Sequence, residues 1–208
     1  MPYPTSRTET IADGAVHVAG LALAVPASLW LIHQAPVAAY PATAIYAACM
    51  VFAFAASALY HLLPFDRWRG LLGRVDHAAI YFKIAGTYTP FVVVMGLWLG
   101  YGVLALVWLL AAGGAVAKLF FWRLDGRGSL ALYLGMGWLS VLLLWPMVQH
   151  LPGISVALVA IGGLTYSAGT LVYAHPGMRY QNAIWHAFVL GASICFFIAI
   201  ALSLNAAV

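Results

Sequence analysis

The amino-acid sequence predicts an all-α membrane protein, a seven-transmembrane helix bundle with a cytoplasmic N terminus and the C terminus outside. The prediction depends on the scarcity of charge, the length, and the placement of basic residues. Of the 208 residues, 65% are hydrophobic and 7% are charged, whereas soluble domains are about 25% charged. Because a span with its turn takes roughly 28 residues, the chain has room for about seven spans. This composition excludes a water-soluble enzyme, a disordered chain and a nucleic-acid partner.

The first two spans are separated by prolines. We expect span one over residues 14–33, following Arg7. This apolar run is longer than the core of a typical signal peptide, so we interpret it as a membrane helix. Pro36 and Pro41 indicate a short turn, and span two follows over residues 41–63.

Charged and glycine-rich segments bound the next two spans. A polar linker over residues 66–74 precedes span three, which we expect over 75–95. The segment 96–102 contains three glycines and predicts a break before span four, which ends near Phe121. The charged segment 123–127 then predicts a loop.

The remaining part of the chain holds three spans. Residues 128–178 contain no Asp, Glu, Lys or Arg and are too many for one helix. The sequence Pro152-Gly153 is a strong turn signal, which divides this stretch into spans five and six. Span seven follows over residues 181–204.

The basic residues predict the orientation. Eight of the nine lie before span one or near the segments that connect span two to three, span four to five, and span six to seven. These are Arg7, Arg67, Arg69, Arg74, Lys118, Arg123, Arg127 and Arg179. Only Lys83 falls within a span. By the positive-inside rule, we expect a cytoplasmic segment over 1–13, one membrane domain over 14–204 and an external tail over 205–208, in the cytoplasmic (inner) membrane.

Polar side chains recur at the predicted cytoplasmic ends of several spans. Three spans carry a pair four residues apart, and span three opens with two such residues in a row; the members are Asp13 with His17, Ser57 with His61, Asn182 with His186, and Asp76-His77. Residues four apart share a helix face. Three imidazoles and a carboxylate at one depth are typical of a metal site with an open position.

Other interpretations of these residues stay open. Asp13 could cap span one, and Asp76 could cap span three or pair with Arg74. Lys83 could extend toward the cytoplasmic interface or pair with Asp76 or Asp13. We interpret the other three histidines, His33, His150 and His175, as interfacial residues.

Several motifs together resemble the haemolysin III family, the bacterial branch of the progestin and adipoQ receptor family. The resemblance covers nearly the whole chain in order, through TETIADGAVHVAG (8–20), Ser57-x-x-x-His61, DHAAI (76–80), IAGTYTPF (84–91) and IWHAFVL (184–190). The family implies seven spans with a cytoplasmic N terminus.

The resemblance also implies a zinc ion near the cytoplasmic face. When the family's site is carried over to the matching positions of this sequence, His61 and His186 are zinc ligands, Asp76 holds the zinc-bound water, and Ser57 supports the ligands. This chain departs from the family at Asn182, where the family has a further histidine ligand, and amide groups bind zinc poorly. Asp13 stands where relatives often carry Asn. Asp13, His17 and His77 are therefore candidate replacements.

We therefore predict a zinc-dependent hydrolase acting on the amide or ester bond of a membrane lipid, with Asp76 and Ser57 as catalytic residues. One alternative is an ion- or proton-conducting, membrane-homeostasis protein whose pathway includes Lys83. Another is a sensor that retains a degenerate metal site.

Overall fold

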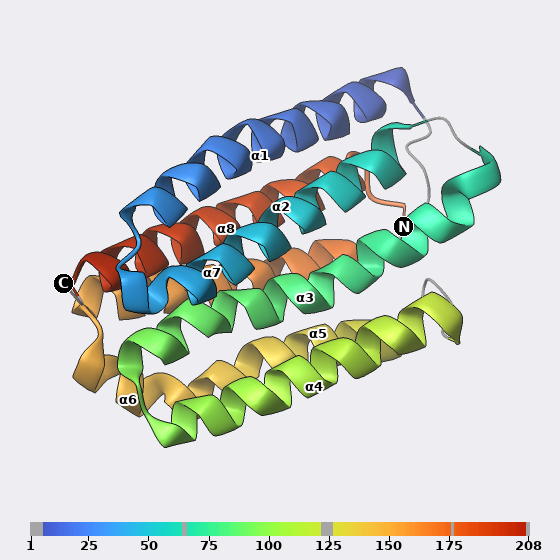
Figure 1. Ribbon diagram of the computed structural model, residues 1–208. Helices are drawn as coiled ribbons and strands as arrows, with labels where there is room; N and C mark the ends of the chain where they lie inside the picture. The colour runs from blue at the N-terminus through green and yellow to red at the C-terminus, as the bar shows by residue number, and fades with distance from the viewer. Residues whose placement is uncertain (1–5, 64–65, 122–126, 176, 207–208) are drawn as a thin grey trace.

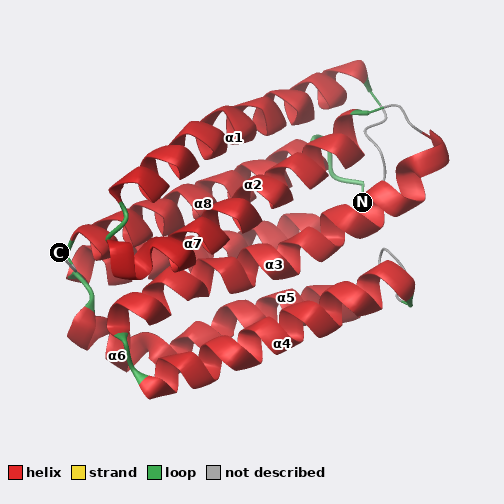
Figure 2. Cartoon of the chain, in the orientation of Figure 1, coloured by secondary structure: helices red, strands yellow, loops and turns green. Residues whose placement is uncertain are grey.

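The described part of the chain is helical, with short turns and no strand (Figures 1 and 2). The computed structural model describes residues 6–63, 66–121, 127–175 and 177–206. Its helices are α1 (Arg7–Gln34), η1 (Val37–Ala39), α2 (Tyr40–Leu62), η2 (Asp66–Trp68), α3 (Arg69–Met95), α4 (Trp98–Phe120), α5 (Arg127–Trp138), η3 (Leu139–Leu143), α6 (Leu144–His150), α7 (Gly153–Tyr173) and α8 (Gln181–Asn205). Seven segments of this part are long and apolar enough to span a membrane, which confirms the predicted all-α fold with seven spans.

The helices run side by side and form one bundle (Figure 1). Helices α1, α2, α3 and α4 pack in chain order, and α7 packs on α8. Because α8 also packs on α1 and contacts α3, the last helix meets the first three α-helices of the chain. The most buried of the seven spans is α3.

The first helix begins earlier than predicted. Ser6 caps α1: its side chain accepts a hydrogen bond from the Glu9 backbone N–H (3.3 Å), and the Ser6 N–H donates to the Glu9 carboxylate (3.2 Å). This reciprocal pair satisfies N–H groups that the start of a helix leaves unpaired. The helix therefore starts at Arg7, and the possible capping role of Asp13 is wrong because Asp13 lies in the helix interior.

Helix α3 also begins earlier, at Arg69, so most of the predicted linker is helical. The Arg74 guanidinium donates to the backbone oxygen of Leu119 (2.7 Å), near the carboxyl end of α4. The last carbonyls of a helix lack intrahelical partners and attract cations, which explains this contact. In the part of the chain that the structure describes, Arg74 makes no ion pair with Asp76.

The break between α3 and α4 is shorter than predicted. Gly96 has φ 65°, a left-handed conformation that glycine adopts without strain, and α4 begins at Trp98. Gly100 and Gly102 lie within the helix. Other glycines allow close packing: a Cβ at Gly86 would lie 2.8 Å from the Cys49 Cβ, and one at Gly114 would lie 2.7 Å from the Tyr81 ring.

The fifth span departs from α-helical geometry in its middle, where α5 passes through η3 into α6. Pro146 has no N–H, so it cannot make the helical bond to the carbonyl four residues earlier, which lies in η3. The Tyr88 hydroxyl lies 2.8 Å from the backbone oxygens of both Met136 and Gly137, just before η3. Tyr88 thereby supplies a hydrogen bond where the regular helix stops.

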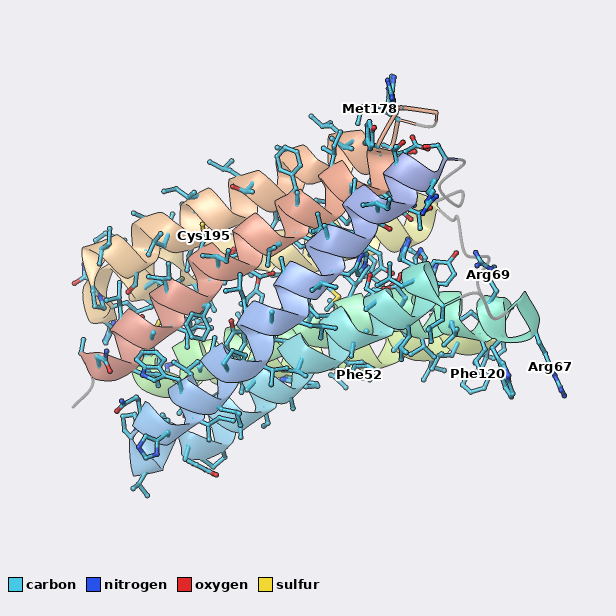
Figure 3. All side chains as sticks on the ribbon, turned by 90° about the horizontal axis from the view of Figure 1, so that it is seen from above. Phe52, Arg67, Arg69, Phe120, Met178 and Cys195 are labelled. Carbon is cyan, nitrogen blue, oxygen red and sulfur yellow. The ribbon has the colours of Figure 1, made fainter. Side chains whose placement is uncertain are left out.

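Arg67, Arg69 and Met178 lie at the same end of the bundle (Figure 3). That end holds the starts of α1, α3 and α8 and the finish of α2 (Figure 1). Arg123 of the predicted loop lies outside the described residues, as do residues 1–5 and 207–208 of the two predicted terminal segments.

Candidate metal centre

The predicted polar residues of four helices meet in one group, which we call the histidine cluster. Its members are Asp13 and His17 from α1, Ser57 and His61 from α2, Asp76 and His77 from α3, and His186 from α8. The exposed fractions of Asp13, His17, His61, Asp76 and His77 are 8% or less. Buried groups of this kind require partners, and most of the partners are other members of the cluster.

Asp13 lies behind three imidazole rings. Its Oδ1 accepts a hydrogen bond from His186 Nδ1 (2.7 Å), and its Oδ2 lies 3.4 Å from His61 Nδ1. The backbone oxygen of Asp13 accepts a hydrogen bond from His17 Nδ1 (2.8 Å). The Nδ1 atoms of all three rings therefore face this one residue.

These contacts determine which imidazole nitrogens are available to bind a metal ion. His17 and His186 each use Nδ1 as the donor, so a neutral ring carries its lone pair on Nε2. Both Nε2 atoms point to the Ser57 hydroxyl, at 3.1 Å and 3.4 Å. The centres of these two rings are 4.3 Å apart. Metal-binding histidines in proteins usually donate the second N–H to a carboxylate or backbone oxygen, as these two do.

Two buried atoms in the cluster lack hydrogen bonds. They are Asp13 Oδ2 and His61 Nδ1. The His61 ring lies 4.6 Å from the His186 ring and 5.4 Å from the His17 ring. Buried polar atoms without partners are costly, and a bound cation beside them would reduce that cost. Asp13, His17 and His186 offer ligand atoms within 4.8 Å of one another, so this cluster could hold a metal ion.

Asp76 lies on the other side of His61 from Asp13. Its Oδ2 is 3.9 Å from His61 Nε2 and 3.8 Å from His77 Nδ1. His77 Nδ1 donates to the backbone oxygen of Gly73 (2.6 Å), and His77 Nε2 lies 3.5 Å from the Tyr173 hydroxyl. The two carboxylates thus lie on opposite sides of the His61 ring.

The remaining histidines, Asn182 and Lys83 lie at different positions relative to the histidine cluster. Asn182 is buried in the first turn of α8, one turn before His186. His33, His150 and His175 are exposed, and none of them joins the cluster. The Lys83 Nζ lies 4.7 Å from the centre of the Phe54 ring. Within the described residues, Lys83 pairs with neither Asp13 nor Asp76, so that interpretation of Lys83 is wrong.

Aromatic residues that were not predicted from the sequence form part of the cluster's surroundings. Tyr60, Tyr173 and Trp185 line a small cavity of about 60 Å³ together with the histidines, which we call the polar pocket. The sequence did hold a signal, since Tyr60 and Trp185 immediately precede His61 and His186.

A second, larger cavity adjoins the polar pocket. Its volume is about 320 Å³, and its lining is mainly apolar, from α3, the fifth span, α7 and α8. We call it the apolar cavity. Lys83 and Tyr166 line both spaces and mark where they meet.

Comparison with known proteins finds similar chains in several organisms. Residues 5–197 match the sequence profile of the family described as Haemolysin-III related. A Hemolysin-3 homolog of Bacillus subtilis (strain 168) is 38% identical over 197 residues, 91% of each chain. Hemolysin-3 of Bacillus cereus is 36% identical, covering 91% of this chain and 89% of its own. The human Monocyte to macrophage differentiation factor is 29% identical, covering 75% of this chain and 67% of its own.

Proposed function

Because this chain belongs to the Haemolysin-III related family, we propose that it is a zinc-dependent hydrolase that cleaves an amide or ester bond of a membrane lipid. The family and the seven apolar helices make it an integral, multi-pass membrane protein. We further propose that it resides in the cytoplasmic (inner) membrane with the histidine cluster toward the cytoplasm. Arg67 and Arg69 at that end of the bundle support this orientation (Figure 3).

The convergence of two imidazole Nε2 atoms on one point supports the proposal most strongly. The Nδ1 hydrogen bonds of His17 and His186 to Asp13 orient both rings. His61 faces Asp13 in the same way, at 3.4 Å. We infer that His17, His61 and His186 would hold zinc through Nε2, with Asp13 fixing the rings from behind. In this arrangement His17 compensates for the asparagine at position 182.

A zinc ion with an open position supplies Lewis acidity, which polarises a carbonyl and acidifies water. Asp76 lines the polar pocket, and its Oδ2 lies 3.9 Å from His61 Nε2, on the side of the ring away from Asp13. Its carboxylate is therefore placed to accept a proton from water. Ser57 lies between the Nε2 atoms of His17 and His186 and holds both rings toward the pocket.

The apolar cavity favours a lipid over an ion as the substrate. An ion that leaves the polar pocket past Lys83 would enter a space with a mainly apolar lining. Loss of hydration without replacement ligands is costly for an ion. An acyl chain fits such a lining, and its carbonyl end would then face the histidines.

Metal analysis of the detergent-purified protein tests this function. We expect about one zinc ion per chain in the wild type, a content typical of a site with three protein ligands. His17→Ala should bring the content far below that value. His33→Ala makes the same change on the same helix, at an exposed position outside the cluster, and should leave the zinc content unchanged. A wild-type protein without zinc, or equal zinc in the two variants, would contradict the proposed site.

A further inference from the structure

Lys83 lies where the polar pocket and the apolar cavity meet. It belongs to α3, the most buried span, and its side chain lines both spaces. The position is therefore next to the proposed reaction site and also on the wall of the apolar cavity. A cationic side chain within a membrane span is costly and is a candidate for a functional role.

The surroundings of Lys83 do not neutralise its charge. Its Nζ lies 4.7 Å from the centre of the Phe54 ring, a contact that compensates only part of the desolvation cost. In the part of the chain that the structure describes, the Lys83 ammonium forms no hydrogen bond or ion pair; only its backbone oxygen accepts one, from the Thr87 hydroxyl. The carboxylates of Asp13 and Asp76 contact histidines instead. An anionic group at this position would complete the ammonium's environment.

The apolar cavity limits what that anion can be attached to. Its volume of about 320 Å³ is at the low end of the range for ligand pockets, about 300–1,000 Å³. Phe91, Leu143, Met147 and Phe196 are among its lining residues. Such a space suits one hydrocarbon chain better than the two chains of a phospholipid.

We propose that Lys83 makes the apolar cavity selective for an anionic single-chain lipid, and that its ammonium binds the carboxylate of a fatty acid whose hydrocarbon chain fills the cavity. The proposal deepens the proposed function and rests on it for the claim that this acid is a reaction product. Binding itself requires only Lys83 and the cavity, so it is measured on metal-free protein.

The experiment compares radiolabelled palmitate with palmitamide, a neutral probe with the same chain. Chelator-treated protein in a nonionic detergent is titrated with each probe. Because hydrogen bonds to charged groups contribute about 1.5–3 kcal/mol, Lys83→Met should weaken palmitate binding at least about tenfold. Palmitamide binding should weaken less than palmitate binding, because its neutral amide oxygen can accept a hydrogen bond from the ammonium but lacks the attraction between two opposite charges. Lys83→Arg, which keeps the charge, should retain most of the palmitate affinity.

A second pair of variants tests the cavity. Gly163 lines the apolar cavity and has open space at its Cβ position, so Gly163→Leu should weaken binding of both probes. Gly135 has equal space but does not line the cavity, so Gly135→Leu should have no effect. Unchanged palmitate binding in Lys83→Met, or an equal loss of both probes, would overturn the proposal. Failure of zinc binding or hydrolysis leaves these results unaffected, so the two proposals fail separately.

Discussion

The polar pocket and the apolar cavity adjoin each other but are built on different physical requirements. Around the polar pocket, side chains far apart in sequence, such as Asp13 and His186, are joined by a short hydrogen bond, and the remaining space is about 60 Å³. The apolar cavity is larger, about 320 Å³, and one of its walls is the fifth span, where the α-helix is interrupted. Buried polar groups must find partners, which draws helices together, whereas an apolar wall has no such requirement. In the proposed function, the reaction takes place in the first space and the lipid chain occupies the second.

The largest expected effect tests whether the polar pocket carries the chemistry. Asp76→Asn keeps the shape of the side chain but removes its ability to accept a proton. We expect release of fatty acid from amide- or ester-linked lipids to fall by about 10²–10⁴-fold, as for loss of a general base. Zinc content should stay at the wild-type value, because His17, His61 and His186 are intact. Undiminished release would remove Asp76 from the mechanism.

Close packing beside the apolar cavity should be sensitive to one added methyl group. In Gly114→Ala the new Cβ would lie 2.7 Å from the Tyr81 ring, whose centre is 4.4 Å from that of the cavity-lining Tyr133. Overpacking of this kind costs about 1–3 kcal/mol, so the midpoint of thermal unfolding in detergent should fall. Gly113→Ala, the adjacent position with open space, should leave the midpoint unchanged or raise it. Equal midpoints for the two variants would show that α4 is not tightly packed against the Tyr81 ring.

A substitution toward the family pattern tests the role that His17 takes in the polar pocket. Asn182 lies one turn before His186 on the same face of α8, so Asn182→His places another imidazole near the proposed ligands. We expect zinc affinity, measured by competition with a chromophoric chelator, to rise about tenfold, a typical size for changes around metal ligands. His17→Ala should lose less zinc in this background than in the wild type. A decrease in affinity would indicate that position 182 faces away from the site.

The smallest expected effect concerns the wall of the apolar cavity. Tyr88→Phe removes the hydroxyl that contacts the carbonyls of Met136 and Gly137 where α5 ends. Loss of one buried hydrogen bond should lower the free energy of unfolding by about 1 kcal/mol. The control is Tyr101→Phe, at an exposed tyrosine on α4. Thermal unfolding that is identical in both variants would mean that this hydrogen bond does not stabilise the interrupted helix.

The spans and the gathering of polar residues were predictable because both depend on local patterns. Long apolar runs form helices in a membrane, and residues four apart share a face, so Asp13 with His17 and Ser57 with His61 could be paired in advance. The early starts of α1 and α3 were missed because residues 7–13 and 69–74 begin and end with a charged residue, which interrupts the apolar pattern. Polar residues form helices when a cap such as Ser6 or a contact such as Arg74 with Leu119 supports them.

By itself, the sequence determined that this chain is a seven-span helical bundle of the haemolysin III type, with Asp13, Asp76 and most of its histidines toward one end. Only the tertiary structure decided that Asp13 lies behind His17, His61 and His186, and that Lys83 lines two cavities instead of pairing with a carboxylate. The reason is geometric. Helical periodicity states which residues share a face, but the rotation of each helix, set by packing against its neighbours, decides what that face meets.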